Sequence, residues 1–362
     1  MRRFIVLIII LCVVVPVDCY AMSAKSYILI DAENGRVLYA QNENEKLPMA
    51  STTKIMTALV AIENSNPDDT VTVSNNAANT EGSSMYLKAG DKISMRELLY
   101  GLMLASGNDA AVAIAEHISG NVESFAVKMT ERAKETGALD TSFKNPNGLD
   151  ADGHYTTAKD LALITQEALK NPLFAEIVQT KSINLSGTTY TNHNKLLSKY
   201  EGITGVKTGF TKRCGRCLVS SCERSGFSLI AVTLNDPDDW NDHIYLYDKA
   251  FAEYKYHQII SNGQNAGIIT TIDGNPLNLI YKGVVGAYLN ESEIRRVSVK
   301  NNMPDSLSLP VKRGERAGSA YVSVDGVSLG GCEIVFGESR EISEKRLKDF
   351  IWDTLQMWLS AF

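Results

Sequence analysis

The chain has 362 residues, of which 44% are hydrophobic and 22% charged, and its formal net charge is −6 at pH 7. This length predicts about two domains with ample core, and the ordinary composition excludes a low-complexity or collagen-like protein. The acidic balance argues against a nucleic-acid-binding protein, because no basic face would neutralise phosphates.

The first 21 residues have the pattern of a secretory signal peptide. Two arginines precede an unbroken apolar run over residues 4–15, and Cys19 and Ala21 close the segment. The run is too short to cross a bilayer comfortably, so we expect cleavage after Ala21 and export of the remainder. An uncleaved N-terminal anchor is the alternative. Removing residues 1–21 takes away two arginines and one aspartate, which leaves a formal charge of −7.

The next part of the chain predicts a hairpin followed by helices. Apolar residues alternate over residues 26–41 around the turn Glu33-Asn34-Gly35, which is typical of a β-hairpin. A helix is expected over residues 51–63, and residues 64–95 are polar and loop-rich. Helical patterns then cover residues 95–117, with an interruption at Ser106-Gly107-Asn108, and residues 125–138 and 156–170.

Short strands return from about residue 181 and are followed by one more helix. The expected strands cover residues 181–187, 205–210, 216–223 and 227–235, and the helix covers residues 243–256. The order of strands, helices and strands predicts an α+β fold. Its first and last strands should join one antiparallel sheet, with the helices packed on it.

The C-terminal third predicts two further parts. Residues 259–338 contain short β-rich segments and should form a small all-β domain, and residues 339–362 predict an amphipathic helix. The apolar stripe of this helix comprises Leu347, Phe350, Ile351, Trp352, Leu355, Trp358 and Phe362, and Lys345, Arg346 and Lys348 lie at its start. Tryptophans beside basic residues favour a helix lying in a membrane interface, and docking on the protein itself is the alternative.

Ser51 and Lys54 form an SxxK motif at the start of the first expected helix. Residues three apart share a helix face, so the hydroxyl and the amine should lie close together. A serine needs a base beside it to be a nucleophile at neutral pH, and lysine serves when burial or another cation lowers its pKa. The apolar neighbours Met49 and Ile55 could supply that burial. The alternative is a helix-capping serine beside a solvated lysine.

Two further motifs support the first interpretation. Ser106 and Asn108 break a helical region, which suits a loop that presents side chains into a cleft, although SxN alone is a weak signal. Lys207-Thr208-Gly209 lies on an expected strand. Gly209 would permit close backbone approach to a ligand, and the lysine and the hydroxyl could hold an anionic group.

SxxK, SxN and KTG in this order are the signature of penicillin-binding proteins and class A β-lactamases. The segments PMASTTKIMTA, LMLASGNDAAVAIAE, NPNGLDADGHYTTAKDLA and GVKTGFTKRCGRCLVSS closely resemble the low-molecular-mass D-alanyl-D-alanine carboxypeptidases of the penicillin-binding protein 5 type. The resemblance covers about residues 25–257, and the β-rich part and the tail match that family's layout. It implies a penicillin-binding/β-lactamase-like transpeptidase domain, an antiparallel sheet with a helical subdomain, over residues 22–258.

The resemblance also implies a reaction, acyl transfer without cofactor or metal. Ser51 would attack the carbonyl between the terminal D-alanines of a peptidoglycan stem peptide, and Lys54 would accept its proton. Ser106 would relay a proton to the leaving D-alanine. β-Lactam antibiotics would acylate the same Ser51.

The remaining motif residues are implied to bind the substrate. Asn108 would position Lys54 and the substrate amide. Lys207 and Thr208 would bind the terminal carboxylate, and Lys207 would also keep Lys54 neutral by repulsion. Backbone N–H groups at Ser51 and Phe210 would form the oxyanion hole, beside Gly209. Such an enzyme would act outside the cytoplasm, held peripherally on the outer face of the cell membrane by its C-terminal helix.

Two rival functions share these motifs. A class A β-lactamase would need a glutamate on a loop after SxN to activate water, but Glu167 lies in a helical run and the motif is SGN instead of SDN. A non-catalytic wall-binding protein would keep the fold without the chemistry, although the motif residues are intact. Gly326-Val327-Ser328-Leu329-Gly330 matches the nucleophile elbow GxSxG, but strand-like sequence follows it, so we expect a turn.

Histidines and cysteines carry weaker signals. We expect His154 to orient its loop, and His193 to be either a solvated loop residue or a residue near the substrate carboxylate. Neither histidine has a metal-ligand partner at close spacing. CGRC at Cys214 and Cys217 resembles a metal or redox motif, but no second CxxC completes a zinc site. Ordinary buried thiols, occasionally paired, are the prediction for these two and for Cys222 and Cys332.

Overall fold

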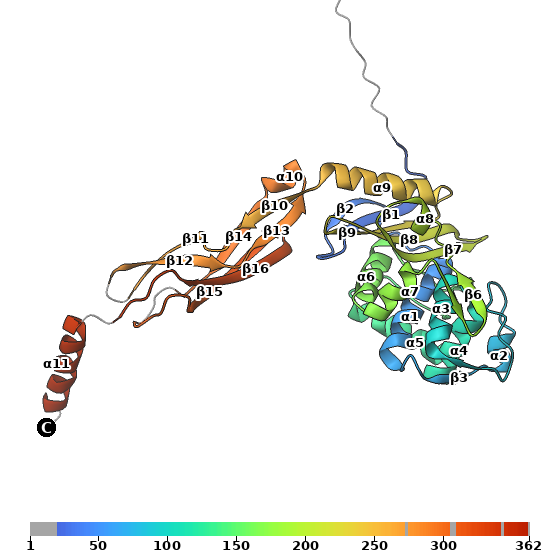
Figure 1. Cartoon of the computed structure of the whole chain (residues 1–362), viewed down its shortest axis with the longest axis horizontal. Coiled ribbons are helices and arrows are strands. Elements are labelled where there is room, and N and C mark those ends of the chain that lie inside the picture. The colour runs from blue at the N-terminus through green and yellow to red at the C-terminus, as the bar shows by residue number, and fades with distance from the viewer. Residues whose placement is uncertain (1–19, 272–273, 305–308, 342–343, 361–362) are drawn as a thin grey trace, which may run out of the picture.

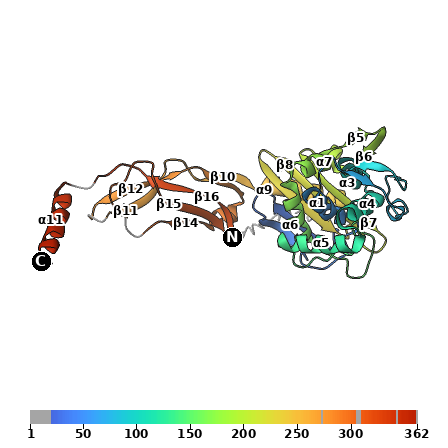
Figure 2. The same cartoon turned by 90° about the horizontal axis from the view of Figure 1, so that it is seen from below.

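The structure is a computed structural model that describes residues 20–271, 274–304, 309–341 and 344–360. The expected signal peptide before residue 20 and Phe362 lie outside the described residues. Figures 1 and 2 show a helix-and-sheet N-terminal region (residues 20–254), an elongated β region (residues 255–341) and a helix at its far end. The chemistry-bearing motifs all lie in the N-terminal region.

A five-stranded antiparallel sheet forms the centre of the N-terminal region, in the order β2-β1-β9-β8-β7. Its strands are β1 (Ser26–Asp31), β2 (Val37–Gln41), β7 (Ile203–Thr211), β8 (Gly215–Arg224) and β9 (Phe227–Leu234). Tyr27 of β1 pairs with Thr233 of β9, which confirms that the first and last strands meet in one sheet. The predicted hairpin is also confirmed, with Gly35 in the left-handed region at φ 73°.

Helices cover both faces of this sheet (Figure 1). The helix α9 (Asp239–Glu253) lies on one face, where Leu246, Tyr247 and Ala250 pack against Leu29 and Leu229. The other face carries the helical subdomain and the largest core cluster. Its longer helices are α1 (Lys54–Asn64), α3 (Met95–Leu104), α4 (Asn108–Ser119), α5 (Val122–Glu135), α6 (Ala158–Leu169) and α7 (Pro172–Gln179).

Local sequence explains where several of these helices begin. Ser94, Asn121 and Thr157 each accept a hydrogen bond from a backbone N–H of the first helical turn of α3, α5 and α6. Such caps satisfy N–H groups that have no partner inside the helix. Asn171 caps α7 in the same way, and Pro172 occupies its first position, where a missing N–H costs nothing.

Short elements complete the N-terminal region. They are the 3₁₀ turn η1 (Ala50–Thr53), β3 (Thr70–Thr72), α2 (Asn75–Ala78), β4 (Lys92–Ser94), β5 (Ser182–Leu185), β6 (Thr188–Thr191) and α8 (Leu196–Lys199). Residues 64–95 therefore contain more structure than the expected loop, because β3 and β4 pair over three residues. The predicted helix 243–256 begins earlier, at Asp239, and ends at Glu253.

The β region contains a five-stranded sheet of order β11-β12-β16-β15-β14 and a two-stranded sheet of β10 and β13. Its elements are β10 (Lys255–Ile260), β11 (Asn265–Thr270), β12 (Pro276–Lys282), β13 (Val285–Leu289), α10 (Glu291–Ile294), β14 (Val297–Asn302), β15 (Arg316–Val324) and β16 (Val327–Phe336). Alternate residues such as Leu277, Leu279 and Tyr281 form its own core. The expected boundary after residue 258 falls inside β10.

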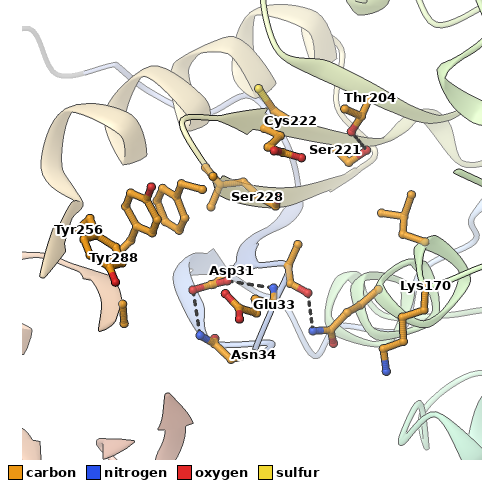
Figure 3. Close-up of a pocket in the computed structure, with 18 of the residues that line it drawn as sticks. Asp31, Glu33, Asn34, Lys170, Thr204, Ser221, Cys222, Ser228, Tyr256 and Tyr288 are labelled. Carbon is orange, nitrogen blue, oxygen red and sulfur yellow. Dashed lines mark hydrogen bonds between the residues drawn. The ribbon is translucent and has the colours of Figure 1, made fainter. Parts of the chain in front are cut away.

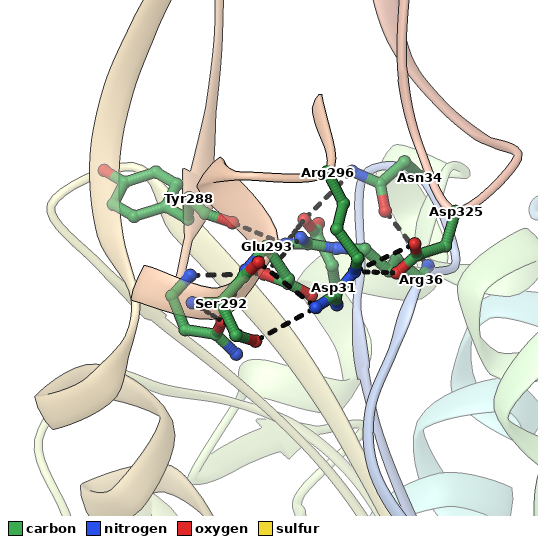
Figure 4. A network of polar contacts seen from close by, with 9 residues as sticks. Asp31, Asn34, Arg36, Tyr288, Ser292, Glu293, Arg296 and Asp325 are labelled. Atoms are coloured by element: carbon green, nitrogen blue, oxygen red, sulfur yellow. Dashed lines mark hydrogen bonds and ion pairs between the residues drawn. The ribbon is translucent and has the colours of Figure 1, made fainter. Parts of the chain in front are cut away.

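A buried ion-pair network joins the two regions (Figure 4). Arg36, in the turn before β2, donates to Glu293 of α10 at 2.8 Å and to the carbonyl oxygen of Tyr288. Asp31 lies 3.6 Å from the same guanidinium, and the Tyr288 ring stacks on Phe227 with centroids 4.2 Å apart. The regions are therefore held by specific contacts as well as by the chain.

The C-terminal helix is α11 (Glu344–Ser360), which lies beyond the β region in both views (Figures 1 and 2). Its described apolar side chains Ile351, Trp352, Leu355, Met357, Trp358 and Leu359 are exposed. No helix within the described residues combines the length and the apolar character that a membrane span requires.

Candidate active site

Ser51 and Lys54 lie at the junction of η1 and α1, on the face of the helical subdomain that meets β7. Lys54 Nζ is 2.9 Å from Ser51 Oγ. The Ser51 side chain caps neither helix, because no side-chain cap hydrogen bond is present at either helix start. Lys54 is 0% exposed, so the alternative of a capping serine beside a solvated lysine does not describe this site.

Three oxygen atoms surround the Lys54 amine. Besides Ser51 Oγ, it contacts Asn108 Oδ1 at 2.7 Å and the carbonyl oxygen of Asn147 at 2.6 Å. The two amide oxygens can only accept, so they require two N–H groups. An uncharged amine has two N–H groups and one lone pair, and the remaining contact is a hydroxyl that can donate to that lone pair. The three contacts fit an ammonium that donates to all three oxygens and equally fit a neutral amine that accepts from the serine O–H, so the pKa of Lys54 decides between the two.

Burial and charge both favour that neutral form. Burial lowers the pKa of Lys54 well below its ordinary value, and the Lys207 ammonium lowers it further. Asp109 opposes these effects weakly. Burial also lowers the pKa of Lys207 to about 7. Two buried lysines close together are costly to charge simultaneously, so the site can hold an unprotonated amine at neutral pH.

The break between α3 and α4 brings Ser106 and Asn108 to the same place. Ser106 is buried at φ 60°, a conformation that few non-glycine residues adopt. Asn108 donates through Nδ2 to the carbonyl oxygen of Glu81 at 2.6 Å, and its own N–H donates to the carbonyl oxygen of Ser83 at 2.7 Å. These bonds leave Asn108 Oδ1 directed at Lys54.

The next residue, Asp109, anchors the segment that flanks this break. Its buried carboxylate accepts from the N–H groups of Met85 and Leu87 and from the Ser84 hydroxyl at 2.6 Å. A carboxylate with several donors needs no counter-ion. Asp109 therefore supports the site from behind without taking a place in it.

The Lys207-Thr208-Gly209 strand passes directly beside the turn that carries Ser51. A Cβ atom on Gly209 would lie 3.0 Å from the Met49 carbonyl oxygen and 3.2 Å from the Ser51 nitrogen, so a larger residue here would have to displace the backbone of the nucleophile turn by a few tenths of an ångström. Lys207 is 1% exposed and donates to the carbonyl oxygen of Thr208 at 2.9 Å. The structure thus brings all three motifs together, as the sequence predicts.

A pocket of about 330 Å³ opens above these residues. Its lining contains the predicted residues Ser51, Ser106, Thr208, Gly209 and Phe210, while Lys54, Asn108 and Lys207 lie beneath it. The sequence did not single out the other polar lining residues, which are Ser83, Lys195, Arg216, Asp239 and Trp240. Arg216 donates to Asp239 at 2.7 Å, so this side of the pocket presents an anchored cation.

Asn147 and Gly148 contact the residues of the candidate site and were missed by motif reasoning. The Asn147 carbonyl contacts Lys54, and a Cβ on Gly148 would lie 2.0 Å from the Ala50 carbonyl oxygen. Gly148 also has φ 87°, so the loop can pass the nucleophile turn only with glycine there. The available signal was the NPNG segment, which carries part of the family resemblance but no chemistry-bearing side chain at position 148.

The two histidines differ in role. His154 is buried; its Nδ1 accepts from the Lys144 N–H at 3.0 Å, so its Nε2 carries the proton that it donates to Thr53 Oγ1 at 2.8 Å. Burial lowers the pKa of His154 to about 4, with a smaller effect of Lys144. His193 lines the pocket. Partial desolvation lowers its pKa, and the charges of Lys207 and Lys54 lower it further by smaller amounts.

Three other features of the sequence take no direct part in this chemistry. Glu167 is in α6, paired with Arg132 and Lys170 at 2.8 Å each, and does not line the pocket. Gly326 lies in the turn between β15 and β16, but Val327–Gly330 already belong to β16, so the GxSxG match is mostly strand where a turn was expected; no helix follows it, as a nucleophile elbow would require. The cysteines Cys214, Cys217, Cys222 and Cys332 are free thiols, and the described residues contain no group of three or more His, Cys, Asp or Glu that could hold a metal ion.

A larger cavity of about 830 Å³ lies elsewhere, between the N-terminal region and the β region. Figure 3 shows its lining, with Asp31 and Glu33 on the first hairpin, Lys170 just after the C-terminal end of α6, and Tyr256 and Tyr288 from the β region. None of the motif residues lines it. Size alone therefore does not identify the site, whereas the buried lysines do.

Comparison with known proteins gives an independent indication of function. The family model described as D-alanyl-D-alanine carboxypeptidase matches residues 14–238. The chain is 35% identical to D-alanyl-D-alanine carboxypeptidase DacF of Bacillus subtilis over 325 residues, 85% of this chain and 84% of the relative. It is 30% identical to D-alanyl-D-alanine carboxypeptidase DacC of Escherichia coli, over 96% of this chain and 92% of the relative.

Solved structures agree with the sequence comparisons. The fold is similar to that of penicillin binding protein 5 from Haemophilus influenzae, with a TM-score of 0.71 and 26% identity. The similarity covers 89% of this chain and 99% of that structure. It therefore extends through the β region as well as the sheet and helices around the pocket.

Proposed function

The chain belongs to the D-alanyl-D-alanine carboxypeptidase family and is a serine-type hydrolase of the penicillin-binding type, and from this premise we propose that Ser51 is the acylated nucleophile and Lys54 its base. The observation that carries the proposal is the contact of 2.9 Å between Ser51 Oγ and the buried Lys54 amine. The hydroxyl proton would pass to the amine lone pair as Oγ attacks the carbonyl between two terminal D-alanines. General-base assistance of this kind contributes about 10²–10⁴-fold to rate.

The surrounding contacts support a fixed orientation for the base. Asn108 Oδ1 and the Asn147 carbonyl oxygen accept the two N–H groups of neutral Lys54, which directs its lone pair toward Ser51. Positioning of this kind lowers the entropy cost of reaching the reactive geometry. Asn108 would also bind the substrate amide, and Ser106 would relay a proton to the leaving D-alanine.

We place the terminal carboxylate of the substrate against Lys207 and Thr208. A buried cation beside a hydroxyl suits a carboxylate, because binding supplies the counter-charge that Lys207 lacks in the free protein. The close approach at Gly209 allows the backbone N–H groups of Ser51 and Phe210 to serve as the oxyanion hole. Such donors are typically worth ~3 kcal/mol each in transition-state stabilisation. Water would then release the acyl group from Ser51.

The test is the Ser51→Ala variant, assayed for two reactions. It should lose release of D-alanine from a pentapeptide ending in D-Ala-D-Ala and should lose covalent labelling by a fluorescent penicillin. Ser83→Ala, which removes a hydroxyl from the same pocket, is the matched control and should remain labelled. Release of D-alanine that survives in Ser51→Ala would overturn the nucleophile assignment.

We propose that the enzyme acts outside the cytoplasm on the outer face of the cell membrane. Residues 1–21 would be removed on export, residues 22–258 would form the carboxypeptidase domain and residues 259–338 a β spacer, with the junction of the two inside β10. Residues 339–362 would form a peripheral anchor, and the exposed Trp352, Leu355 and Trp358 on α11 support this proposal.

The anchor is tested by truncation. Protein that lacks residues 340–362 should stay in the supernatant when vesicles of mixed anionic and neutral phospholipid are sedimented, whereas the longer chain should sediment with them. Acylation by penicillin should be equal in the two proteins, because α11 lies apart from the N-terminal region (Figure 1), which supplies all the residues that line the pocket. Equal sedimentation of both proteins would contradict the anchor.

A further inference from the structure

We propose that Cys214 and Cys217 are a redox-active pair that closes to a reversible disulfide by thiol–disulfide exchange. Their Sγ atoms lie 3.8 Å apart, and the side chains are 2% and 0% exposed. No group of three or more His, Cys, Asp or Glu residues that could hold a metal occurs in the described part of the chain, so these thiols are not half of a metal site there. Oxidation is the reaction open to two adjacent thiols in an exported protein.

The hairpin between β7 and β8 brings the two sulfurs together. Thr211 pairs with Gly215, and Thr211 Oγ1 accepts from the Cys214 N–H at 3.1 Å. Gly215 has φ 69°, which bends the chain between the two cysteines. A disulfide needs an S–S distance of about 2.05 Å, so closure requires side-chain rotation and a small shift of the hairpin tip. It does not require a new strand pairing.

The thiols differ in a way that fits stepwise exchange. The contact with Cys217 lowers the pKa of Cys214 to about 7, whereas the pKa of Cys217 is raised well above its ordinary value. Because Cys214 is 2% exposed, the hairpin tip must first open; its thiolate would then attack an external disulfide, form a mixed disulfide and release one thiolate. Cys217 would then lose its proton, attack the Cys214 sulfur and release the second thiolate. The protein loses two electrons, and the external disulfide is reduced to two thiols.

The pair is linked to the active site through two sets of contacts. Thr211 Oγ1 donates to Asp150 at 3.1 Å, in the loop whose Asn147 carbonyl contacts Lys54. On the other side, Cys217 lies opposite Gly209, and its Sγ is 3.9 Å from the Pro48 carbonyl oxygen, just before the Ser51 turn. Closing the disulfide would therefore shift the hairpin tip, which contacts both the loop of Asn147 and the segment just before Ser51. This link to the nucleophile and the oxidising surroundings outside the cytoplasm both rest on the proposed function.

The first experiment detects the bond itself. Trypsin cleaves after Arg213, Arg216 and Arg224, so the reduced chain yields separate peptides 214–216 and 217–224. After equilibration of the purified enzyme with oxidised glutathione and alkylation of free thiols, we expect these two peptides to remain linked until dithiothreitol is added. Cys214→Ser should abolish the linked peptide and Cys222→Ser should retain it. Separate alkylation or glutathionylation of Cys214 and Cys217, without a linked peptide, would overturn the proposal.

The second experiment measures the consequence. The oxidised wild-type enzyme should melt a few degrees higher than the reduced enzyme and should react with a fluorescent penicillin about twofold or more slowly. Cys214→Ser should react at the rate of reduced wild type whether or not oxidised glutathione is present. A linked peptide with unchanged acylation would refute the connection to the site. No acylation in either redox form would instead contradict the assignment of Ser51.

Discussion

The N-terminal region and the β region differ most clearly in what they bury. The N-terminal region buries Lys54, Lys207, Arg36, Glu97, His154, His243 and six aspartates, whereas Glu293 is the one buried charged residue among the described residues of the β region. That glutamate faces Arg36 of the other region. The β region otherwise has an apolar core, which is sufficient for a spacer.

The buried charges of the N-terminal region are themselves of two kinds. Asp109 has several hydrogen-bond donors, and Arg36 has two acidic neighbours, so these groups stabilise structure. Lys54 and Lys207 have no ion pair within the described residues. Burying a lysine without a counter-ion lowers the stability of a protein. Such lysines are found mainly where a reaction or a ligand requires them. The contrast identifies the reactive site more sharply than cavity size does.

The largest expected effect comes from replacing the base with an apolar side chain of similar volume. Lys54→Met should slow acylation by a fluorescent penicillin by about 10²–10⁴-fold. Its free energy of unfolding in urea should change by no more than about 1–3 kcal/mol in either direction. The amine is no longer desolvated on folding, but Asn108 Oδ1 and the Asn147 carbonyl oxygen lose their donor. Lys159→Met, at an exposed position, should change neither quantity. A large loss of stability in Lys54→Met would mean that the lysine is structural.

The next effect concerns the paired charge between the regions. Glu293→Gln should lower the free energy of unfolding by about 3 kcal/mol. The buried Arg36 charge would then have the more distant Asp31 as its acidic partner. The amide can still accept the Asn290 N–H, so the cap of α10 is preserved. The measurement is urea unfolding, and acylation should be unchanged. Glu291→Ala, on the exposed side of α10, is the control; an equal loss there would show that α10 itself is responsible.

A smaller effect should appear in the dependence of stability on pH. The pKa of His154 is about 4 in the folded chain and near 6.5 when unfolded, so the unfolded state binds a proton first as the pH falls. The free energy of unfolding should therefore decrease below pH 6.5, by up to about 1.4 kcal/mol per pH unit, until pH 4 is reached. His154→Asn should flatten this slope. An unchanged slope in His154→Asn would mean that other groups, such as the buried His243, cause the pH dependence of stability.

The smallest expected effect is a dependence of activity on pH that distinguishes Lys54 from Lys207. Activity requires neutral Lys54 and, by our proposal, protonated Lys207, whose pKa is about 7 in the free enzyme. The kcat/KM for D-alanine release should therefore rise as Lys54 deprotonates and fall about tenfold per pH unit above pH 7. Lys207→Arg, which stays charged, should remove the alkaline decrease. A decrease that persists in this variant would belong to a different group.

The sequence by itself determined the elements and the motif chemistry. Hydrophobic periodicity and turn residues predict the first hairpin, the helices on either side of Ser106 and the strand that carries Lys207. Both signals depend on residues that are close together in the sequence. The spacing of Ser51 and Lys54 likewise fixes their contact within one helical turn. The order of the three motifs was enough to indicate the family.

Only the tertiary structure decided what surrounds those residues. The Lys54 contacts with Asn108 and Asn147 join positions 54 and 93 residues apart, and the Asn147 contact uses a carbonyl that every residue possesses. The place of Gly148, the Arg36–Glu293 pair and the approach of the Cys214 and Cys217 sulfurs also depend on how distant or bent segments pack. Periodicity carries no information about such contacts, because packing between elements sets their burial, pKa and partners.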